Sequence, residues 1–220
     1  RGIWRTDGTE GGTFLLQNFV GPASALAPDL EGPRYLTTAR GIIFFSADDG
    51  STGRELWTLT PGTDVISQLA DLNPGPGSSN PAYLFTHNRT VYLAVIKGGG
   101  TDEIWRSDGM SVSFALDLLP FSVSNPRYLT TLHGKVVVLV ADGPGGPATV
   151  LLRYEPSNDA ASVIADVSGA GGRSRNLRWL QNVYFSRNGD RIGAESGAVM
   201  EEGLQERAYF AAENDMSDPD

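Results

Sequence analysis

The feature of this sequence that most constrains its fold is an internal repeat with a period of about 48 residues. Tryptophan recurs at Trp4, Trp57 and Trp105, at nearly even spacing, and Leu152 continues the series. An aromatic residue followed by leucine recurs in the same phase, at Tyr35, Tyr83, Tyr128 and Trp179. Self-similarity at a period of this length is typical of repeat architectures, in which each repeat folds into the same unit.

Each repeat predicts short β-strands joined by tight turns. Apolar runs of four to six residues, rich in β-branched and aromatic side chains, occupy positions 42–45, 91–96 and 136–140. Runs of this length and composition are typical of buried strands. Residues that tolerate the positive φ of hairpin turns stand between the expected strands, for example at Arg40-Gly41, Asn88-Arg89, Asp49-Gly50, Asp7-Gly8 and Asp108-Gly109. No stretch of twelve or more residues shows a capped helical pattern, so we predict an all-β fold class with four strands per repeat.

Four antiparallel strands in a unit of this length are typical of a β-propeller blade. We therefore expect a small propeller of four blades, three of them continuous, around residues 33–71, 81–117 and 126–166. The recurrent tryptophan and tyrosine positions are expected to pack between the blades.

The two ends of the chain are expected to form the fourth blade together. The chain begins at the third strand of the template, and residues 209–215 resemble the second strand at residues 44–50. A composite blade of 177–213 plus 1–19 would close one domain over residues 1–220 and remove the exposed sheet edges. The alternative is that the chain forms part of a larger ring, completed by more sequence or by another chain. Residues 186–205 do not fit the template and are expected to form an irregular insertion.

The tryptophan segments resemble a family of bacterial β-propeller-like repeats with the signature Glu-Leu-Trp-x-x-Asp-Gly-Thr. Residues 3–9 read Ile-Trp-Arg-Thr-Asp-Gly-Thr, residues 55–57 read Glu-Leu-Trp, and residues 103–109 read Glu-Ile-Trp-Arg-Ser-Asp-Gly. The fourth repeat departs from the signature, with Leu152 in place of the tryptophan and Glu155-Pro156 in place of Asp-Gly. The resemblance covers about residues 1–190. It implies a propeller fold in a large secreted or surface protein, and it implies no particular activity.

The charge of the chain argues against a nucleic-acid partner. The formal net charge is −9 at pH 7, so a phosphate backbone would be repelled. No apolar run approaches the length of about 18 residues that a membrane-spanning helix needs, which predicts that the protein does not span a membrane. Arg1 is not an initiator methionine, which fits a removed secretory signal. We therefore expect an extracytoplasmic location: periplasmic, cell-surface or secreted.

The sequence holds few residues for catalysis. The absence of cysteine excludes disulfides, cysteine-bound zinc and thiol nucleophiles. His87 and His133 fall at the same turn of neighbouring repeats, and no third imidazole is present for a histidine metal site or a serine-histidine-aspartate triad. We therefore predict no enzyme but a binding or scaffold module, most simply one that takes a protein partner within a larger assembly.

Two sets of charged residues keep other functions open. Arg34, Arg127 and Arg178 each precede the aromatic marker, so they would ring one mouth of a propeller channel and bind an anion or a glycan. The alternative is an ion pair between each arginine and an aspartate of a neighbouring blade.

The second set is acidic and consists of two loops, one with Asp48 and Asp49 and the other with Asp215 and Asp218. Carboxylates and loop carbonyls are the ligands that calcium takes, which opens a calcium-dependent hydrolase or lyase. Acidic residues that simply form hairpin turns would give the same pattern.

Overall fold

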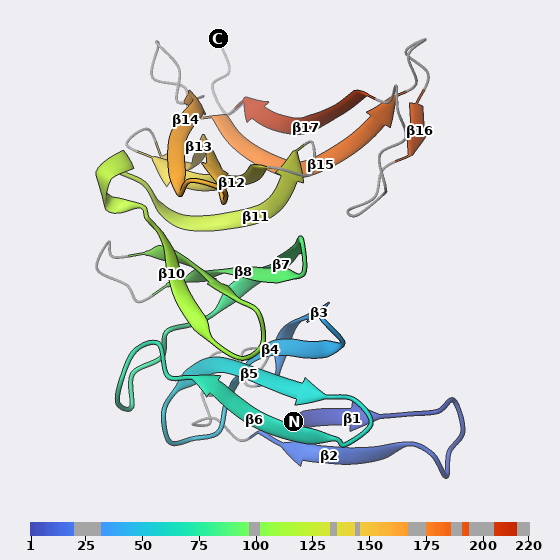
Figure 1. Ribbon diagram of the computed structural model, residues 1–220. Coiled ribbons are helices and arrows are strands. Elements are labelled where there is room, and N and C mark those ends of the chain that lie inside the picture. Colours follow the sequence, from blue (N-terminus) through green and yellow to red (C-terminus); the bar gives the residue numbers. More distant parts are fainter. Residues whose placement is uncertain are drawn as a thin grey trace, which may run out of the picture. The chain divides into compact units, whose positions relative to one another are not determined.

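The computed structural model describes residues 1–19, 32–96, 102–132, 136–143, 146–166, 175–185, 191–193 and 205–214 (Figure 1). The chain divides into two compact units, Arg1–Lys97 with Trp105–Ser113, and Gly98–Ile104 with Phe114–Asp220. Regular structure in the described residues is β throughout, apart from one 3-10 turn, η2 (Leu119–Phe121). The predicted all-β fold class is confirmed.

Three repeats each form a four-stranded sheet in which the strands follow one another in chain order. The first sheet consists of β3 (Arg34–Ala39), β4 (Ile42–Asp48), β5 (Arg54–Thr60) and β6 (Val65–Ala70). The second consists of β7 (Ala82–His87), β8 (Thr90–Val95), β9 (Glu103–Ser107) and β10 (Val112–Asp117). The third consists of β11 (Ser124–Leu132), β12 (Val136–Gly143), β13 (Gly146–Glu155) and β14 (Ala160–Asp166). The three continuous repeats predicted from the tryptophan and tyrosine spacing therefore have the predicted four strands.

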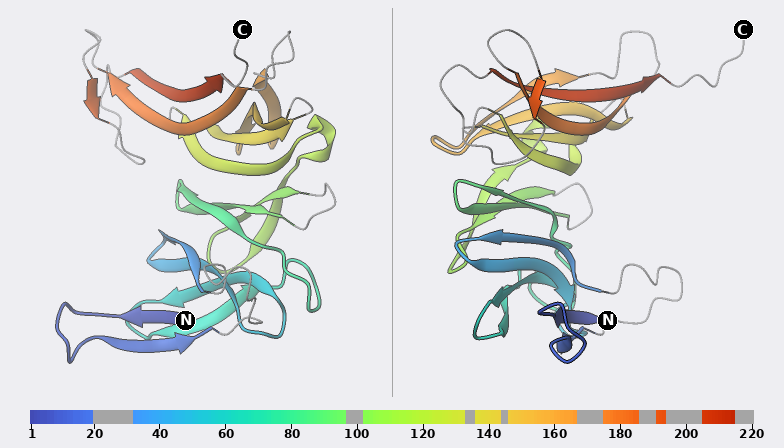
Figure 2. Two further views of the ribbon diagram at one scale, coloured as in Figure 1. Left: turned by 180° about the vertical axis from the view of Figure 1, so that it is seen from behind. Right: turned by 90° about the vertical axis from the view of Figure 1, so that its right-hand side faces the viewer.

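The segments predicted to make the composite blade are also strands, in two separate sheets. At one end of the chain, β1 (Gly2–Arg5) pairs with β2 (Phe14–Asn18). At the other, β15 (Arg175–Phe185) pairs with β17 (Gln205–Asn214) and with β16 (Arg191–Gly193), as both views of Figure 2 show. Within the described ranges, no hydrogen-bonded sheet contains strands from both ends. Residues 191–193 of the expected insertion form β16, and its other residues lie outside the described ranges apart from Gln205, which begins β17.

The core of the first unit lies on the second and third strands of its sheets. Phe44, Phe45 and Ala47 on β4 are fully buried, as a near-continuous apolar run predicts. Phe19 packs edge-on against Phe45 and Trp57, with ring centroids 5.6 and 5.1 Å away. Such edge-to-face pairs add about 1 kcal/mol to the burial of the rings themselves.

The recurrent tryptophans differ in burial. Trp57 is 7% exposed and donates from its indole N–H to the carbonyl of Ala47 at 3.1 Å. Trp105 is half-buried and packs against the cluster that contains Leu93. Trp4 is 62% exposed, because among the described strands only β2 pairs with the strand that carries it, and half a blade leaves one face uncovered. The prediction of a packed tryptophan is therefore confirmed for Trp57 and wrong for Trp4.

The first strand of every repeat carries one extra residue. The pairing of each first strand with its neighbour shifts by one, as in a β-bulge, between Arg34 and Thr37, Ala82 and Phe85, Arg127 and Thr130, and Arg178 and Gln181. Inside the first three bulges, Tyr35, Tyr83 and Tyr128 have φ values of 55°, 52° and 54°. This left-handed conformation is rare for a bulky side chain.

The bulges place tyrosines at the surface. Tyr35 and Tyr128 are 38% and 39% exposed, so their predicted packing between blades is wrong. The physical reason is the extra residue, because it breaks the two-residue alternation by which strand side chains change face.

Candidate functional site

The Asp-Gly turns are closed by their own carboxylates. Oδ1 of Asp7 accepts hydrogen bonds from the amide and hydroxyl of Thr9, at 2.9 and 2.7 Å. Oδ1 of Asp108 accepts from the amides of Met110 and Ser111, both at 3.0 Å. These bonds, that from Met110 first, lower the pKa of Asp108 and keep it ionised. The aspartate of the repeated signature therefore shapes a turn.

The acidic residues proposed for calcium do the same where the structure describes them. Asp49 accepts from the amide and hydroxyl of Ser51 at 2.9 and 2.7 Å, and Asp48 accepts from the amide of Gly50 at 2.7 Å. Burial of Asp49 opposes ionisation, but the bonds from Ser51 outweigh it and lower its pKa. Asp215 and Asp218 lie outside the described residues. Within the described part of the chain, no three histidine, aspartate or glutamate side chains are grouped to hold a metal ion.

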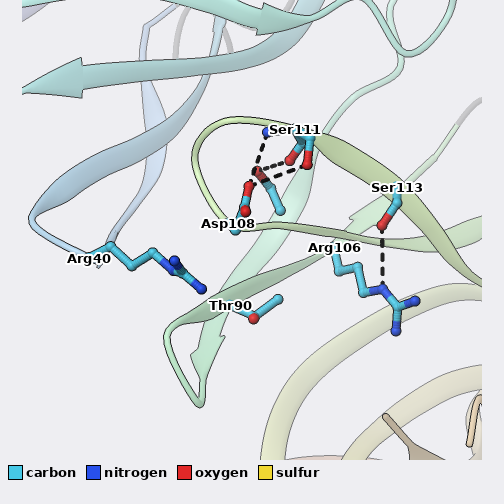
Figure 3. Close-up of a pocket in the computed structure, with 7 residues that line it drawn as sticks. Arg40, Thr90, Arg106, Asp108, Ser111 and Ser113 are labelled. Carbon is cyan, nitrogen blue, oxygen red and sulfur yellow. Dashed lines mark hydrogen bonds between the residues drawn. The ribbon is translucent and has the colours of Figure 1, made fainter. Parts of the chain in front are cut away.

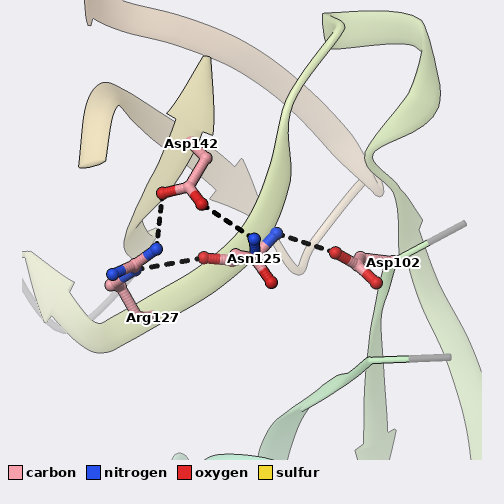
Figure 4. A network of polar contacts seen from close by, with 4 residues as sticks. All are labelled: Asp102, Asn125, Arg127 and Asp142. Carbon is pink, nitrogen blue, oxygen red and sulfur yellow. Dashed lines mark hydrogen bonds and ion pairs between the residues drawn. The ribbon is translucent and has the colours of Figure 1, made fainter. Parts of the chain in front are cut away.

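Arg127, the second of the three candidate arginines, belongs to a polar network in the second unit (Figure 4). Its Nη2 forms an ion pair with Asp142 at 2.5 Å, and its Nε donates to the carbonyl of Asn125 at 3.3 Å. Asn125 donates from its side chain to Asp142 at 2.8 Å and from its amide to the buried Asp102 at 2.7 Å. Asp142 lies on β12, so the ion pair joins two strands of one sheet. The alternative of an ion pair with a neighbouring blade is therefore wrong for this arginine.

The other two arginines lie on equivalent strands. Arg34 is half-buried at the start of β3 in the first unit, beside Arg54. Burial, and then the charge of Arg34, lower the pKa of Arg54. Arg178 begins the bulge of β15, and its side chain lies outside what the structure describes.

Glu55 is a functional group of the fold that the sequence reasoning missed. It is fully buried on β5 and accepts from the amides of Leu72 and Ser79, at 2.8 and 2.7 Å, and from the hydroxyl of Ser79, at 2.5 Å. Burial raises the pKa of this carboxyl. The signal was present in the sequence, since a glutamate beside Leu56 and Trp57 interrupts an apolar run.

Two of the bulge tyrosines lie together in the first unit. The ring centroids of Tyr35 and Tyr83 are 5.4 Å apart, with the rings tilted by 45°. Their strands are joined by Thr86, whose hydroxyl donates to the carbonyl of Thr38 at 2.8 Å. Leu36, next to the pair, is 59% exposed. We call Tyr35, Leu36 and Tyr83 the tyrosine surface.

A polar pocket of about 280 Å³ also lies in the first unit (Figure 3). Its lining consists of two arginines, one aspartate and four hydroxyl residues: Arg40, Arg106, Asp108, Thr90, Ser107, Ser111 and Ser113. None of these residues is among the candidates from the sequence, because they come from turns and strands of two different repeats.

His87 has a structural role. It is 6% exposed, and burial lowers its pKa, which favours the neutral ring. Its Nε2 lies 2.9 Å from the side-chain amide of Asn88. His133 lies outside the described residues. The described histidine therefore offers no base beside a nucleophile.

Comparison with known proteins adds no identity to this geometry. In the described part of the chain there is no helix that is long and apolar enough to cross a membrane. No protein-family model matches the chain, and no curated protein matches it either.

Proposed function

We propose that this chain is a non-catalytic binding module of the β-propeller class, which holds a protein partner in an extracytoplasmic assembly. The observation that carries the proposal is the tyrosine surface. A bulky side chain in the left-handed region costs of order 1–3 kcal/mol, and such strain concentrates at functional positions. Here it recurs at the same position of three successive first strands.

The composition of the tyrosine surface favours a protein over a sugar. Tyrosine and arginine are among the residues most enriched at the energetic centres of protein interfaces. Tyr35 has Arg34 beside it in sequence, and Leu36 extends the aromatic pair with an exposed aliphatic side chain. An aliphatic group of this kind is covered well by an apolar side chain of a protein.

The ring of four blades is part of the same proposal. It is supported by the four-stranded sheets of three repeats and by the bulge that all four first strands share. In such a ring, the strands that bear the tyrosines would line the central channel, and β1 with β2 would complete the blade begun by β15 and β17.

The test is affinity purification of the protein, after cross-linking, from the cells that produce it. Tyr35→Asn with Tyr83→Asn removes both rings, and asparagine tolerates the left-handed φ. We expect a partner that purifies with the wild-type protein in a fixed ratio to be lost, without a loss of unfolding free energy.

The matched control is Val65→Asn, which removes another exposed apolar side chain, 57% exposed, from β6 of the same first sheet. It should retain the partner. A partner that stays bound to the double variant, or that Val65→Asn removes equally, would refute the role of the tyrosine surface. So would the absence of any protein in a fixed ratio.

A further inference from the structure

The pocket of the first unit is built from three turns and strands around a polar space. Arg40 comes from the turn between β3 and β4, Thr90 begins β8, and Arg106 and Asp108 come from the hairpin of β9 and β10. In Figure 3, the side chain of Arg40 reaches across toward Thr90. A volume of about 280 Å³ is at the lower end for a small-molecule site and suits one small ring.

Arg40 occupies a position that its backbone does not favour. With Gly41 it forms the two-residue turn between Ala39 and Ile42, at φ values of 52° and 78°. Asparagine, aspartate or glycine is usual at the first of these positions. The Nε of Arg40 donates to the carbonyl of Arg89 at 3.3 Å, which orients the side chain. A strained arginine held in this way points to a use for its guanidinium group.

Arg106 and Asp108 add opposite charges to the pocket. The Nε of Arg106 donates to the hydroxyl of Ser113 at 3.4 Å. The bonds that Asp108 accepts within its turn all go to Oδ1, so its Oδ2 can accept from a ligand hydroxyl. With two arginines and one ionised aspartate, the lining carries a net positive charge in a chain whose net charge is −9.

The same signature elsewhere in the chain shows which group suits its arginine. Arg5, Thr6 and Asp7 of the first repeat correspond to Arg106, Ser107 and Asp108. Arg5 forms an ion pair with Asp64 on the hairpin of the first sheet. An arginine at this position therefore takes a carboxylate partner within the fold itself.

We propose that this pocket binds an acidic sugar, with a carboxylate held by Arg40 and Arg106 and ring hydroxyls held by Asp108, Thr90 and Ser111. A simple inorganic anion would use the arginines and leave the aspartate facing it. A neutral sugar would use only the aspartate and the hydroxyls. A hydroxylated ring with one carboxylate uses both halves of the lining.

The test is calorimetric titration of the whole chain with three probes: glucuronate, glucose and inorganic sulfate. We expect glucuronate to bind more tightly than sulfate, and glucose to give no measurable heat. Arg40→Asn and Arg106→Gln should each weaken glucuronate binding about tenfold or more, which is the effect of losing one charge-assisted hydrogen bond.

Two choices keep the result interpretable. Arg40→Asn places a favoured residue in the turn, so the fold is not at risk. Arg89→Gln removes the same charge from the neighbouring turn without removing a side chain that lines the pocket, and it should change the affinity by less than about threefold.

Several results would overturn the proposal. They are an absence of glucuronate binding, an unchanged affinity in Arg40→Asn, and an equal loss in Arg89→Gln. Sulfate binding as tightly as glucuronate would show an anion site without sugar recognition, and equally tight glucose would show that the arginines do not contribute. These outcomes leave the tyrosine surface untouched, since it shares no residue with the pocket.

Discussion

Glu55 and Ser79 are joined by two hydrogen bonds across 24 residues of chain, one from the hydroxyl at 2.5 Å and one from the amide at 2.7 Å. A third bond, from the amide of Leu72, ends on the same carboxyl group. Glu55 therefore holds both ends of the segment that leaves the first sheet for β7. Bonds to a charged acceptor contribute about 1.5–3 kcal/mol each, more than those between neutral groups.

The pH dependence of stability should carry the signature of Glu55. Because burial raises its pKa above the ordinary 4.5, the folded state holds this proton more tightly than the unfolded state. The contribution is therefore fully present below about pH 4.5 and is lost as the pH rises through the raised pKa. In urea unfolding at a series of pH values, the wild-type protein should lose stability relative to Glu55→Gln over this range. Both proteins share the turn aspartates, whose effects cancel. A difference that grows in favour of the wild type with rising pH would contradict the prediction.

Gly53 should tolerate alanine far less well than Gly62, although both have positive φ, 75° and 88°. A Cβ at Gly53 would lie 2.8 Å from the amide nitrogen and the hydroxyl oxygen of Ser78, which accepts a bond from Arg54. At Gly62 it would meet nothing within 4 Å. We expect Gly62→Ala to cost about 1–2 kcal/mol from the backbone alone. Gly53→Ala should cost about 2 kcal/mol more, because the neighbouring backbone must move. Urea denaturation of the two variants measures the difference, and equal losses would contradict the close contact.

The repeat made the strands and turns predictable. Apolar runs such as that of β4 and turn pairs such as Arg40-Gly41 are local signals, and the structure has both where the sequence predicts them. The exposure of Tyr35 could not be predicted in the same way, because one extra residue in a strand leaves the residue types unchanged while it reverses the face of every later side chain. The burial of Trp4 failed for another reason, since it depends on which strands cover it and not on its own segment.

The candidate site was less accessible to sequence reasoning than the fold. The arginines proposed for an anion share a local motif, yet Arg127 has its carboxylate partner within its own sheet. The pocket instead joins Arg40 to Arg106, which lie in different repeats, and no spacing rule connects a turn of one repeat with a hairpin of the next. Such pairs become visible only when the strands are paired.

Tyr128→Asn should stabilise the protein slightly. Tyr128 is 39% exposed at φ 54°, so asparagine relieves strain while little buried surface is lost. We expect a gain of about 1 kcal/mol in the free energy of unfolding. The control is Tyr154→Asn in β13 of the same sheet, where the side chain is fully buried and its hydroxyl bonds Asp159. That change should cost about 3 kcal/mol or more. Urea unfolding of the two variants gives both values, and a loss at Tyr128 comparable to that at Tyr154 would show that the ring is part of the core.

Calcium should not stabilise the turn that contains Asp48 and Asp49. Both carboxylates already accept bonds from the turn, and asparagine can accept the same bonds through its side-chain carbonyl. We expect Asp48→Asn with Asp49→Asn to change the free energy of unfolding by less than about 1 kcal/mol. Neither calcium nor a chelator should shift the thermal midpoint of the wild type through this turn. A rise with calcium that the double variant lacks would make this loop a calcium site.

The bonds of Glu55 also decide where the chain can be cut. A fragment that ended at Ala70 would keep all four strands of the first sheet, yet it would leave a buried carboxylate without the donors at Leu72 and Ser79. Ser79 in turn accepts from the amide of Ile96, at 2.9 Å. Excision or shuffling of one repeat as a self-contained cassette is therefore excluded at the sheet boundary, because each repeat is finished by residues that belong to the next.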